Sequence, residues 1–363
     1  MTNVLEPKES SIYGRILPHN NTIRKIYLEI TEKCNLNCPA CFRNNWTHLP
    51  THMSEDVFSK ALTEIKQVET VVIGGIGEPT CHPGFAEYTR QLKDKTLELT
   101  SNAYYWDDIT LDAISSYYKK VTVSVDGLAE TFANVRGFDF EIMAENVRRL
   151  VEKKKKARSK TPAIHAQFVL STDNKDEVKS LIPVLKQIGF QLLVISHLLP
   201  QTEQDKDRIV CTPYLDRELR HFIYSWYPIA ASRQMPIRIP QTKLDSEHRC
   251  TFIENGVVCI TANGDISPCY RFMHEGQEYV FGRKKKIVPV FFGNIKESSL
   301  SDIWYHKEYE TFRFQNFASR YPSCVDCDFV ELCEYITSSE ADCRANEPSC
   351  ADCLWCRGLI ECP

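Results

Sequence analysis

Three cysteines, Cys34, Cys38 and Cys41, form a C-x3-C-x2-C pattern directly after the apolar run 26–31. Thiolates this close along the chain can converge on one metal centre, and three of them can hold three irons of a cubic [4Fe–4S] cluster. The fourth iron then keeps an open position, as an open zinc site does, and can bind and activate a small molecule. A cluster that only carries electrons normally has four cysteine ligands, so the missing ligand indicates a catalytic centre.

A zinc site is the alternative explanation of these cysteines, with a disulfide pair as a further one. Zinc sites usually pair two C-x2-C units or add histidines, and one C-x3-C-x2-C segment fits neither pattern well. His48 and His52 follow closely and could complete a tetrahedral set, so zinc stays open at this stage.

The composition indicates a globular protein of a reducing compartment. The 363 residues are 43% hydrophobic and 25% charged, enough for one large and one smaller domain. The net charge of -4 gives no reason to expect a nucleic-acid partner. Neither an apolar signal segment nor a membrane-length apolar run occurs, so we expect a soluble cytoplasmic protein without a membrane partner. Sixteen cysteines there are better explained as metal or cluster ligands than as disulfides.

Residues 24–200 alternate short β-branched runs with longer amphipathic stretches. The expected strands are 26–31, 70–74, 96–101, 120–125, 163–170 and 191–196. The expected helices lie near 54–67, 84–94, 107–118, 140–158 and 175–188, with a further one at 213–231. Six successive β/α units predict a parallel sheet with helices outside, either doubly wound or a partly closed barrel. Ligands of such sheets bind at the carboxyl ends of the strands.

The second part of the chain has a different character. From residue 247 onward there is little helical periodicity, and eleven of the cysteines lie between Cys250 and Cys362. We place the boundary near 235–247, which gives an N-terminal extension at 1–23, an α/β core at 24–235 and a cysteine-rich domain at 236–363.

The glycine-rich turn Gly74-Gly75-Ile76-Gly77-Glu78-Pro79 follows the second expected strand, where glycines let the backbone approach a ligand closely. Together with the cysteine motif, this turn resembles the radical S-adenosylmethionine (SAM) superfamily over roughly residues 24–200. The resemblance implies a partial (β/α)6 TIM-like barrel. It also implies a [4Fe–4S] cluster whose open iron binds SAM, and reductive cleavage of SAM to a 5′-deoxyadenosyl radical that abstracts hydrogen from a substrate.

The resemblance also implies which residues bind SAM on the cluster side. Gly74, Gly75, Gly77 and Glu78 match the segment that hydrogen-bonds the methionine amine. Asn102 ends the third strand, where the family often has Thr-Asn-Gly and this chain has Ser-Asn-Ala.

Further matches follow strands four and six. Ser124 and Asp126 match the region near the ribose and methionine moieties, and Arg136 matches an arginine that pairs with the methionine carboxylate. A guanidinium fork suits a carboxylate, which supports that match physically. Leu198 and Leu199 match an apolar lip against the adenine.

The C-terminal cysteines resemble the SPASM extension, which carries auxiliary [4Fe–4S] clusters. Its opening element, a cysteine followed by Gly-x4-Cys, and its C-x2-C-x5-C element are both present, but Thr337 stands where the next cysteine is expected. We expect two auxiliary clusters, and which cysteine binds which cluster stays open. The expected ligands are Cys250, Cys269, Cys324, Cys327, Cys333, Cys343, Cys350, Cys353 and Cys362. Cys259 and Cys356 are the least expected ligands. A zinc ribbon made of Cys350, Cys353, Cys356 and Cys362 is the alternative for the tail.

The flanks 26–31, 41–46 and 353–363 are similar to a narrower group, the maturases of tungsten-dependent aldehyde ferredoxin oxidoreductases. The resemblance implies a peptide, protein or metallocofactor precursor as substrate and ferredoxin or flavodoxin as electron donor. Three alternatives stay open: a ribosomal-peptide-modifying enzyme forming thioethers, epimers or carbon–carbon crosslinks, a non-catalytic iron–sulfur electron carrier, and a zinc-stabilised interaction module.

Candidate catalytic side chains follow from position alone. Cys81 and His82 come directly after the glycine-rich turn, and His197 ends the sixth strand. Tyr270 follows Cys269 at the position where sulfatase-maturing enzymes carry an aspartate base, which argues against that reaction.

Overall fold

The structure is a computed structural model that describes residues 22–361, so Cys362 and nearly all of the expected extension 1–23 lie outside the described residues. Its main feature is a sheet with the strand order β7-β6-β5-β4-β3-β2-β1-β8-β9. The strands are β1 (Lys25–Leu28), β2 (Thr70–Ile73), β3 (Thr96–Ser101), β4 (Tyr118–Ser124), β5 (Ala163–Leu170), β6 (Leu192–His197), β7 (Ile237–Arg238), β8 (Val257–Ile260) and β9 (Ile266–Ser267). Every neighbouring pair is parallel except β8 and β9.

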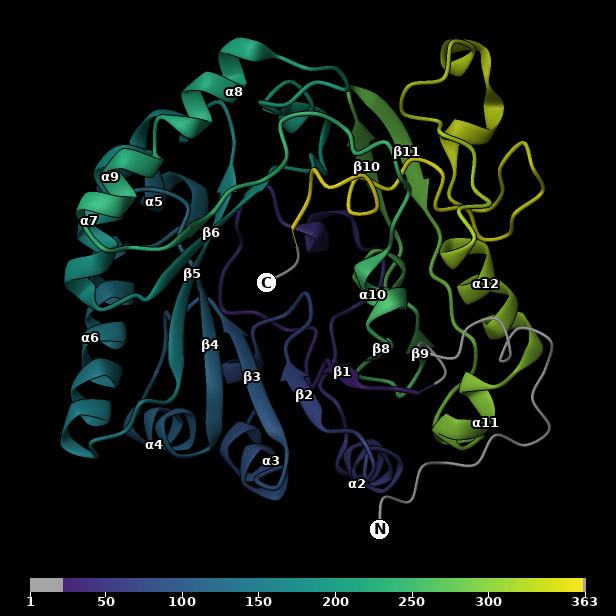
Figure 1. Cartoon of the computed structure of the whole chain (residues 1–363). Coiled ribbons are helices and arrows are strands. Elements are labelled where there is room, and N and C mark those ends of the chain that lie inside the picture. The colour runs from purple at the N-terminus through teal and green to yellow at the C-terminus, as the bar shows by residue number, and fades with distance from the viewer. Residues whose placement is uncertain (1–21, 362–363) are drawn as a thin grey trace.

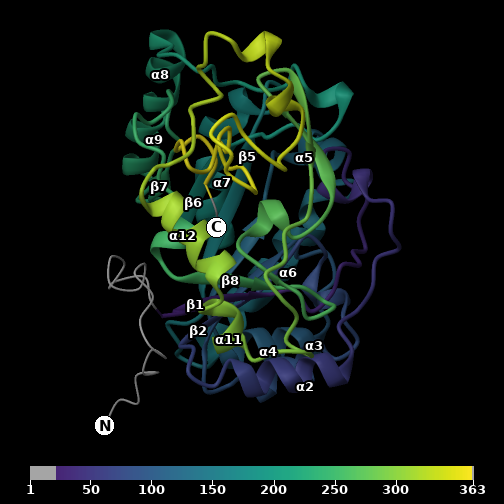
Figure 2. The same ribbon diagram turned by 90° about the vertical axis from the view of Figure 1, so that its right-hand side faces the viewer.

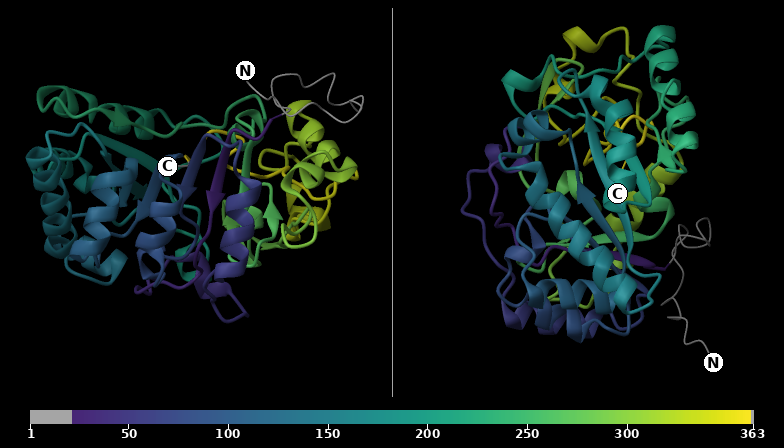
Figure 3. Two further views of the ribbon diagram at one scale, coloured as in Figure 1. Left: turned by 90° about the horizontal axis from the view of Figure 1, so that it is seen from below. Right: turned by 90° about the vertical axis from the view of Figure 1, so that its left-hand side faces the viewer.

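Helices cover the outer face of the curved sheet, as Figure 1 shows, and the N-terminal ones stand in a row when the molecule is seen from below (Figure 3). The helices of the core are α2 (Glu55–Glu64), α3 (Phe85–Gln91), α4 (Asp108–Tyr117), α5 (Ala129–Arg136), α6 (Phe140–Lys156), α7 (Val178–Ile188), α8 (Arg217–Tyr224) and α9 (Tyr227–Ser232). The expected partial (β/α)6 barrel is confirmed, and its strands match the expected ranges closely.

Local sequence explains most element boundaries. The Ser54 side chain accepts a hydrogen bond from the backbone of Val57 and so begins α2. Gly189 ends α7 in the left-handed conformation, with φ of 118°. In α6 the buried residues Met143, Val147 and Leu150 recur at helical spacing and face the sheet.

Two elements differ from the expectation. The segment 213–231 forms two helices rather than one, and Pro228 stands in the first turn of the second, α9, where proline is tolerated. The helix α5 was not expected, because it has only eight residues and buries a single side chain, Phe132. This short helix ends at Arg136, so it decides where that residue lies.

The C-terminal half is built onto the same sheet. Strand β8 pairs in parallel with β1, from Lys25 opposite Val257 to Leu28 opposite Ile260. Its other elements are α10 (Thr251–Glu254), β10 (Gly276–Val280), β11 (Arg283–Ile287), α11 (Leu300–Trp304) and α12 (Lys307–Phe317). Figures 1 and 2 show this half standing beside β1, with α11 and α12 on its outside.

The end of the described chain returns to the concave side of the sheet. The backbone amide of Glu361 donates a hydrogen bond to the Ser196 hydroxyl of β6, 3.0 Å away. The C-terminal end of the described chain therefore lies at the carboxyl ends of the strands, against a residue 165 positions earlier in the sequence (Figure 1). Among the described residues no helix is long and apolar enough to cross a membrane.

Candidate active site and cysteine centres

One large cavity of about 360 Å³ lies at the carboxyl ends of the core strands. Side chains that follow β1 to β6 line it, and so do several from the C-terminal half. Small-molecule sites usually measure roughly 300–1,000 Å³. The cavity therefore has the size of an ordinary small-molecule site.

The three cysteines of the first motif lie together on the wall of this cavity. The sulfur of Cys34 accepts a hydrogen bond from the Leu36 amide at 3.4 Å, and the thiol of Cys38 lies 3.5 Å from the carbonyl oxygen of Arg136. Burial raises the pKa of Cys34 to about 12 and also raises that of Cys38. Neutral thiols at pH 7 become thiolates when a metal displaces their protons, so this donor set fits three corners of a cubane.

The histidines that could have completed a zinc site point elsewhere. Nδ1 of His52 hydrogen-bonds the hydroxyl of Thr31 at 2.8 Å. Nε2 of His48 lies 3.5 Å from a carboxylate oxygen of Glu32. The three thiols thus gain no fourth protein ligand from either histidine.

Glycines of the turn after β2 are required by close packing. A Cβ on Gly77 would lie 2.4 Å from the carbonyl oxygen of Thr31 and 2.7 Å from that of Lys33. The amide of Glu78 donates a hydrogen bond to the same Lys33 oxygen at 2.9 Å. The turn therefore lies directly against the backbone that leads into Cys34.

The carboxylate of Glu78 is buried and fully used by the protein. It accepts hydrogen bonds of 2.7 Å from the Asn102 amide, the Ser101 hydroxyl and the Thr80 hydroxyl. Burial raises its pKa, and these donors act in the opposite direction. Glu78 thus connects the end of β3 to the turn through hydrogen bonds. Because its carboxylate is occupied in this way, a ligand in the cavity would contact backbone groups of the turn.

Asp126 and Arg136 form an ion pair inside the cavity. The other carboxylate oxygen of Asp126 accepts a hydrogen bond from the Val169 amide at 2.6 Å, which fixes its orientation. Within residues 22–361, Nε of Arg136 is buried without a hydrogen-bond partner. The guanidinium acts on Cys38 both by its charge and by a hydrogen bond, so a cationic group stands beside the cysteine motif.

The far wall of the cavity contains Ser124, Leu198, Leu199 and His197. Nε2 of His197 donates to the carbonyl oxygen of Gln241 at 2.9 Å, since a carbonyl can only accept. Burial lowers the pKa of His197 to about 4, so the ring is neutral at pH 7. Its Nδ1 is then an acceptor, and the described residues give it no partner.

Other candidate residues do not reach the cavity. Both nitrogens of His82 bond backbone groups, those of Met53 and Gly84, at 3.1 and 2.9 Å. Cys81 and Gly74 are absent from the cavity wall, although a Cβ on Gly74 would lie 3.3 Å from the hydroxyl of Tyr270. Tyr270, by contrast, does line the cavity.

Several cavity residues were missed by sequence reasoning. They are Gln167, Arg208, Arg271, Trp355 and Glu361. The position of Trp355 between Cys353 and Cys356 is a signal that could have been used. The others have no local pattern, because the fold brings them to the cavity from separate elements.

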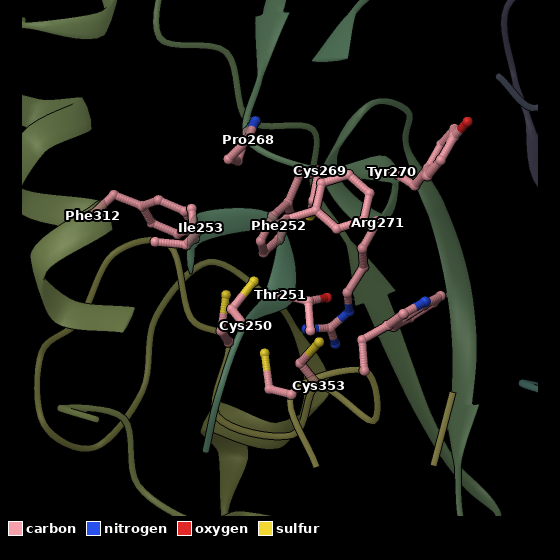
Figure 4. A pocket seen from close by; sticks show the side chains of 14 residues that line it. Cys250, Thr251, Phe252, Ile253, Pro268, Cys269, Tyr270, Arg271, Phe312 and Cys353 are labelled. Carbon is pink, nitrogen blue, oxygen red and sulfur yellow. The ribbon is translucent and has the colours of Figure 1, made fainter. Parts of the chain in front are cut away.

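Five C-terminal cysteines line one small, mostly apolar cavity, shown in Figure 4. They are Cys250, Cys269, Cys350, Cys353 and Cys356. A hydrogen bond from Cys356 and, against the effect of burial, the charge of Arg271 lower the pKa of Cys353 to about 7. This grouping joins the tail to the opening SPASM element, so the tail cysteines do not form a separate zinc ribbon in the described part. Cys356 belongs with them, although it was among the least expected ligands.

A second group of cysteines lies further out. Cys324 and Cys343 influence each other electrostatically, and burial raises the pKa of Cys324 to about 12. Val330 connects Cys327 and Cys333 through its backbone. Its amide donates a hydrogen bond to the carbonyl oxygen of Cys327 at 3.1 Å, and its carbonyl oxygen accepts one from the amide of Cys333 at 3.2 Å. Cys259, buried in β8, belongs to the same apolar cluster as Cys250 and Cys269 but does not line the cavity of the five cysteines.

A buried network of ion pairs stands between the inner cysteine group and the large cavity. Arg271 pairs with Glu278 and, at 3.0 Å, with Asp352, which also pairs with Lys285 at 2.8 Å. Arg271 and Trp355 line both cavities. The two sites are therefore separated by single side chains.

Comparison with known proteins agrees with this architecture. The family model of the radical SAM superfamily matches residues 28–182, and that of the SPASM iron–sulfur cluster-binding domain matches residues 250–328. A "tungsten-containing aldehyde ferredoxin oxidoreductase cofactor-modifying protein" of Pyrococcus furiosus is 34% identical over 94% of this chain and 97% of its own length.

Solved structures show the same fold. Streptococcus suis SuiB bound to its precursor peptide SuiA has a TM-score of 0.63 at 16% identity, covering 94% of this chain and 79% of that one. The structure of anSMEcpe with bound AdoMet has a TM-score of 0.62 at 15% identity, covering 93% of this chain and 91% of that one.

The fold, the cysteine motif in its cavity and these matches define a radical SAM enzyme with a cysteine-rich auxiliary domain. The chain belongs to the radical SAM superfamily, carries a SPASM domain, and is similar over nearly its whole length to a cofactor-modifying protein of tungsten enzymes. The sequence-based family expectation is confirmed, as are its [4Fe–4S] and SAM cofactors.

Proposed function

We propose that Cys34, Cys38 and Cys41 hold the catalytic [4Fe–4S] cluster. When SAM is bound there and the cluster is reduced, this pair of cofactors supplies a 5′-deoxyadenosyl radical. Arg136 binds the SAM carboxylate through N–H groups that Asp126 does not use, because a guanidinium presents five donors and suits a carboxylate.

The remaining cavity residues orient SAM. The backbone of Gly75 and Gly77 approaches the methionine end, Ser124 faces the ribose, and Leu198 and Leu199 pack against the adenine. The acceptor Nδ1 of His197 is available to a hydroxyl or amino donor of the ligand.

The two cysteine groups hold the auxiliary clusters in this proposal. Four of the five inner cysteines bind one cluster, and the outer group binds the other. The outer group consists of Cys324, Cys327, Cys333 and Cys343. The division of the chain into a core at 24–235 and a domain at 236–363 belongs to the same proposal.

The substrate we propose is a tungstopterin cofactor or its precursor, in the maturation of an aldehyde ferredoxin oxidoreductase. The observation that carries this is the 34% identity over 97% of the length of the cofactor-modifying relative. We further propose ferredoxin or flavodoxin as electron donor.

The chemistry of the cavity supports an anionic substrate. Arg136, Arg208 and Arg271 all line it, and each keeps one buried N–H group, Nε or Nη1, without a hydrogen-bond partner in the described part of the chain. Unpaired buried donors are costly, and a phosphate-bearing pterin satisfies such donors with charge-assisted hydrogen bonds. SAM uses the first guanidinium, which leaves Nε of Arg208 and Nη1 of Arg271 for the substrate, since the other groups of both side chains pair with carboxylates.

The test is anaerobic turnover of the cluster-bearing protein with dithionite, SAM and the immature tungsten enzyme. We expect 5′-deoxyadenosine to form only with the partner, and the mass of the extracted pterin to change. An Arg208→Gln variant should weaken use of the partner, whereas Arg148→Gln on the exposed surface of α6 should not. Formation of 5′-deoxyadenosine with a peptide substrate, and none with the tungsten enzyme, would favour the peptide-modifying alternative.

A further inference from the structure

A cluster of two glutamates and two histidines lies beside the active-site cavity, outside the cysteine centres. Glu29 and Glu32 follow β1, His48 belongs to the loop after the cysteine motif, and His274 comes from the C-terminal half. The carboxylates of Glu29 and Glu32 and the imidazole of His274 are buried, while the side chain of His48 is 38% exposed. Ligand atoms of Glu32, His48 and His274 lie within 4.8 Å of one another.

The distances distinguish a metal site from a set of hydrogen bonds. Oε1 of Glu32 lies 3.5 Å from Nε2 of His48 and 3.7 Å from Nδ1 of His274. Both exceed the roughly 2.7–3.2 Å of a nitrogen–oxygen hydrogen bond. Two ligands bound about 2.0–2.1 Å from a tetrahedral ion are themselves about 3.3–3.4 Å apart. The carboxylate oxygen thus lies from each imidazole nitrogen at nearly the spacing of two ligands of one cation, and the ligand atoms of the two histidines lie within 4.8 Å of each other.

Neighbouring groups already hold each ligand in place. Nε2 of His274 lies 2.9 Å and 3.1 Å from the two carboxylate oxygens of Glu29, which leaves Nδ1 directed to Glu32. Oε2 of Glu32 accepts hydrogen bonds from the amide and hydroxyl of Thr51, at 2.8 and 3.0 Å, so Oε1 remains for the cation. Carboxylate–histidine pairs of this kind orient metal ligands and raise their basicity.

Aromatic packing fixes the two imidazoles further. The ring of Trp46 lies 4.8 Å from that of His48 and 4.3 Å from that of His274, centroid to centroid. His48 is the exposed member, so an ion can enter past its ring.

We propose that Glu32, His48 and His274 bind one divalent first-row cation of the Zn²⁺ or Fe²⁺ class. Two imidazoles and one carboxylate are the donors that such ions prefer, and they leave at least one coordination position for water or another ligand. This inference is independent of the substrate proposed above.

The position of this site gives it a structural consequence. Glu29, which orients His274, also accepts a hydrogen bond from the Ile76 amide at 3.0 Å, and its side chain occupies the space that a Cβ on Gly75 would need. The cation therefore links the turn after β2 and the loop after the cysteine motif to the C-terminal half. Its loss should loosen the contact of these segments.

The test uses the full chain with its clusters intact. The protein is washed with EDTA, given one equivalent of Zn²⁺ and passed through a desalting column, and zinc is counted by mass spectrometry. We expect about one zinc per chain in the wild type and in His221→Ala, a surface histidine of α8, and none in His48→Ala. Glu29→Gln keeps the three ligands and should weaken zinc binding about 10- to 100-fold.

Zinc X-ray absorption separates this site from the cysteine centres. We expect a shell of nitrogen and oxygen at about 2.0–2.1 Å without sulfur at about 2.3 Å. A sulfur shell, zinc retained in His48→Ala, or no bound zinc in the wild type overturns the proposal. If His48→Ala loses its clusters as well, the decision rests on Glu29→Gln, and unchanged zinc affinity there overturns it too.

Discussion

Replacement of Gly77 by alanine tests whether the turn after β2 must lie against the cysteine loop. The added Cβ would stand 2.4 Å from the carbonyl oxygen of Thr31 and 2.7 Å from that of Lys33. Real Cβ atoms essentially never come within 3.0 Å of such an atom, and both partners are backbone atoms that no side-chain rotation can move. The clash is relieved only if the turn and the loop separate.

The cost follows from the packing. Overpacked sites lose about 1–3 kcal/mol, which corresponds to about a 5- to 150-fold change in an equilibrium constant. In the proposed site SAM contacts the turn on one side and the cluster of the loop on the other, so we expect this loss to appear as weaker SAM binding. The auxiliary centres lie elsewhere, so at most about four irons per chain should be lost.

The assay is equilibrium binding of SAM to the anaerobic protein, with iron counted on the same sample. Gly276→Ala is the matched control, since a Cβ there meets no atom within 4 Å. If Gly77→Ala binds SAM as tightly as this control and keeps the same iron content, then SAM binding does not require close contact between the turn and the loop.

Three further predictions concern single side chains. Arg136→Lys should weaken SAM binding by about 1.5–3 kcal/mol, measured by calorimetry, because one ammonium cannot replace two sets of guanidinium contacts; unchanged affinity would remove Arg136 from the SAM site. Cys356→Ala should lower iron by about four per chain if this thiol is a ligand, and an unchanged count would identify it as the spare member of the inner group. Burial holds the pKa of His197 at about 4 in the folded protein, whereas in the unfolded chain the ring takes up a proton near its ordinary pKa of about 6.5. Protonation therefore favours the unfolded chain, and the free energy of unfolding falls as the pH drops below about 6.5. His197→Gln should therefore flatten the pH dependence of urea unfolding between pH 7.5 and 5, and parallel curves would contradict this.

Much of the fold and the central site could be predicted because their signals are local. Strand and helix alternation in 24–200 and the spacing of Cys34, Cys38 and Cys41 depend on neighbours in sequence. The glycine-rich turn was predictable for the same reason. Its packing reason, the approach of Gly77 to the chain before Cys34, became visible only in three dimensions.

Other features depend on contacts between distant segments. His274 meets Glu29 across 245 positions, and Arg271 meets Asp352 across 81, so no window of sequence shows either pair. The pairing of tail cysteines with Cys250 and Cys269 likewise depends on how the chain returns to the sheet. His82 was placed among catalytic candidates by position, yet two backbone contacts use both of its nitrogens.

The parallel pairing of β8 with β1 limits how this architecture can be recombined. A chimera cut near residue 236 would leave β1 as an open sheet edge, which invites aggregation. A graft of a relative's auxiliary domain onto this core must therefore include the strand that corresponds to 257–260. That strand must also fit the β1 edge with which it pairs. Evolution of new auxiliary domains on this scaffold is constrained in the same way, so the two halves must change together.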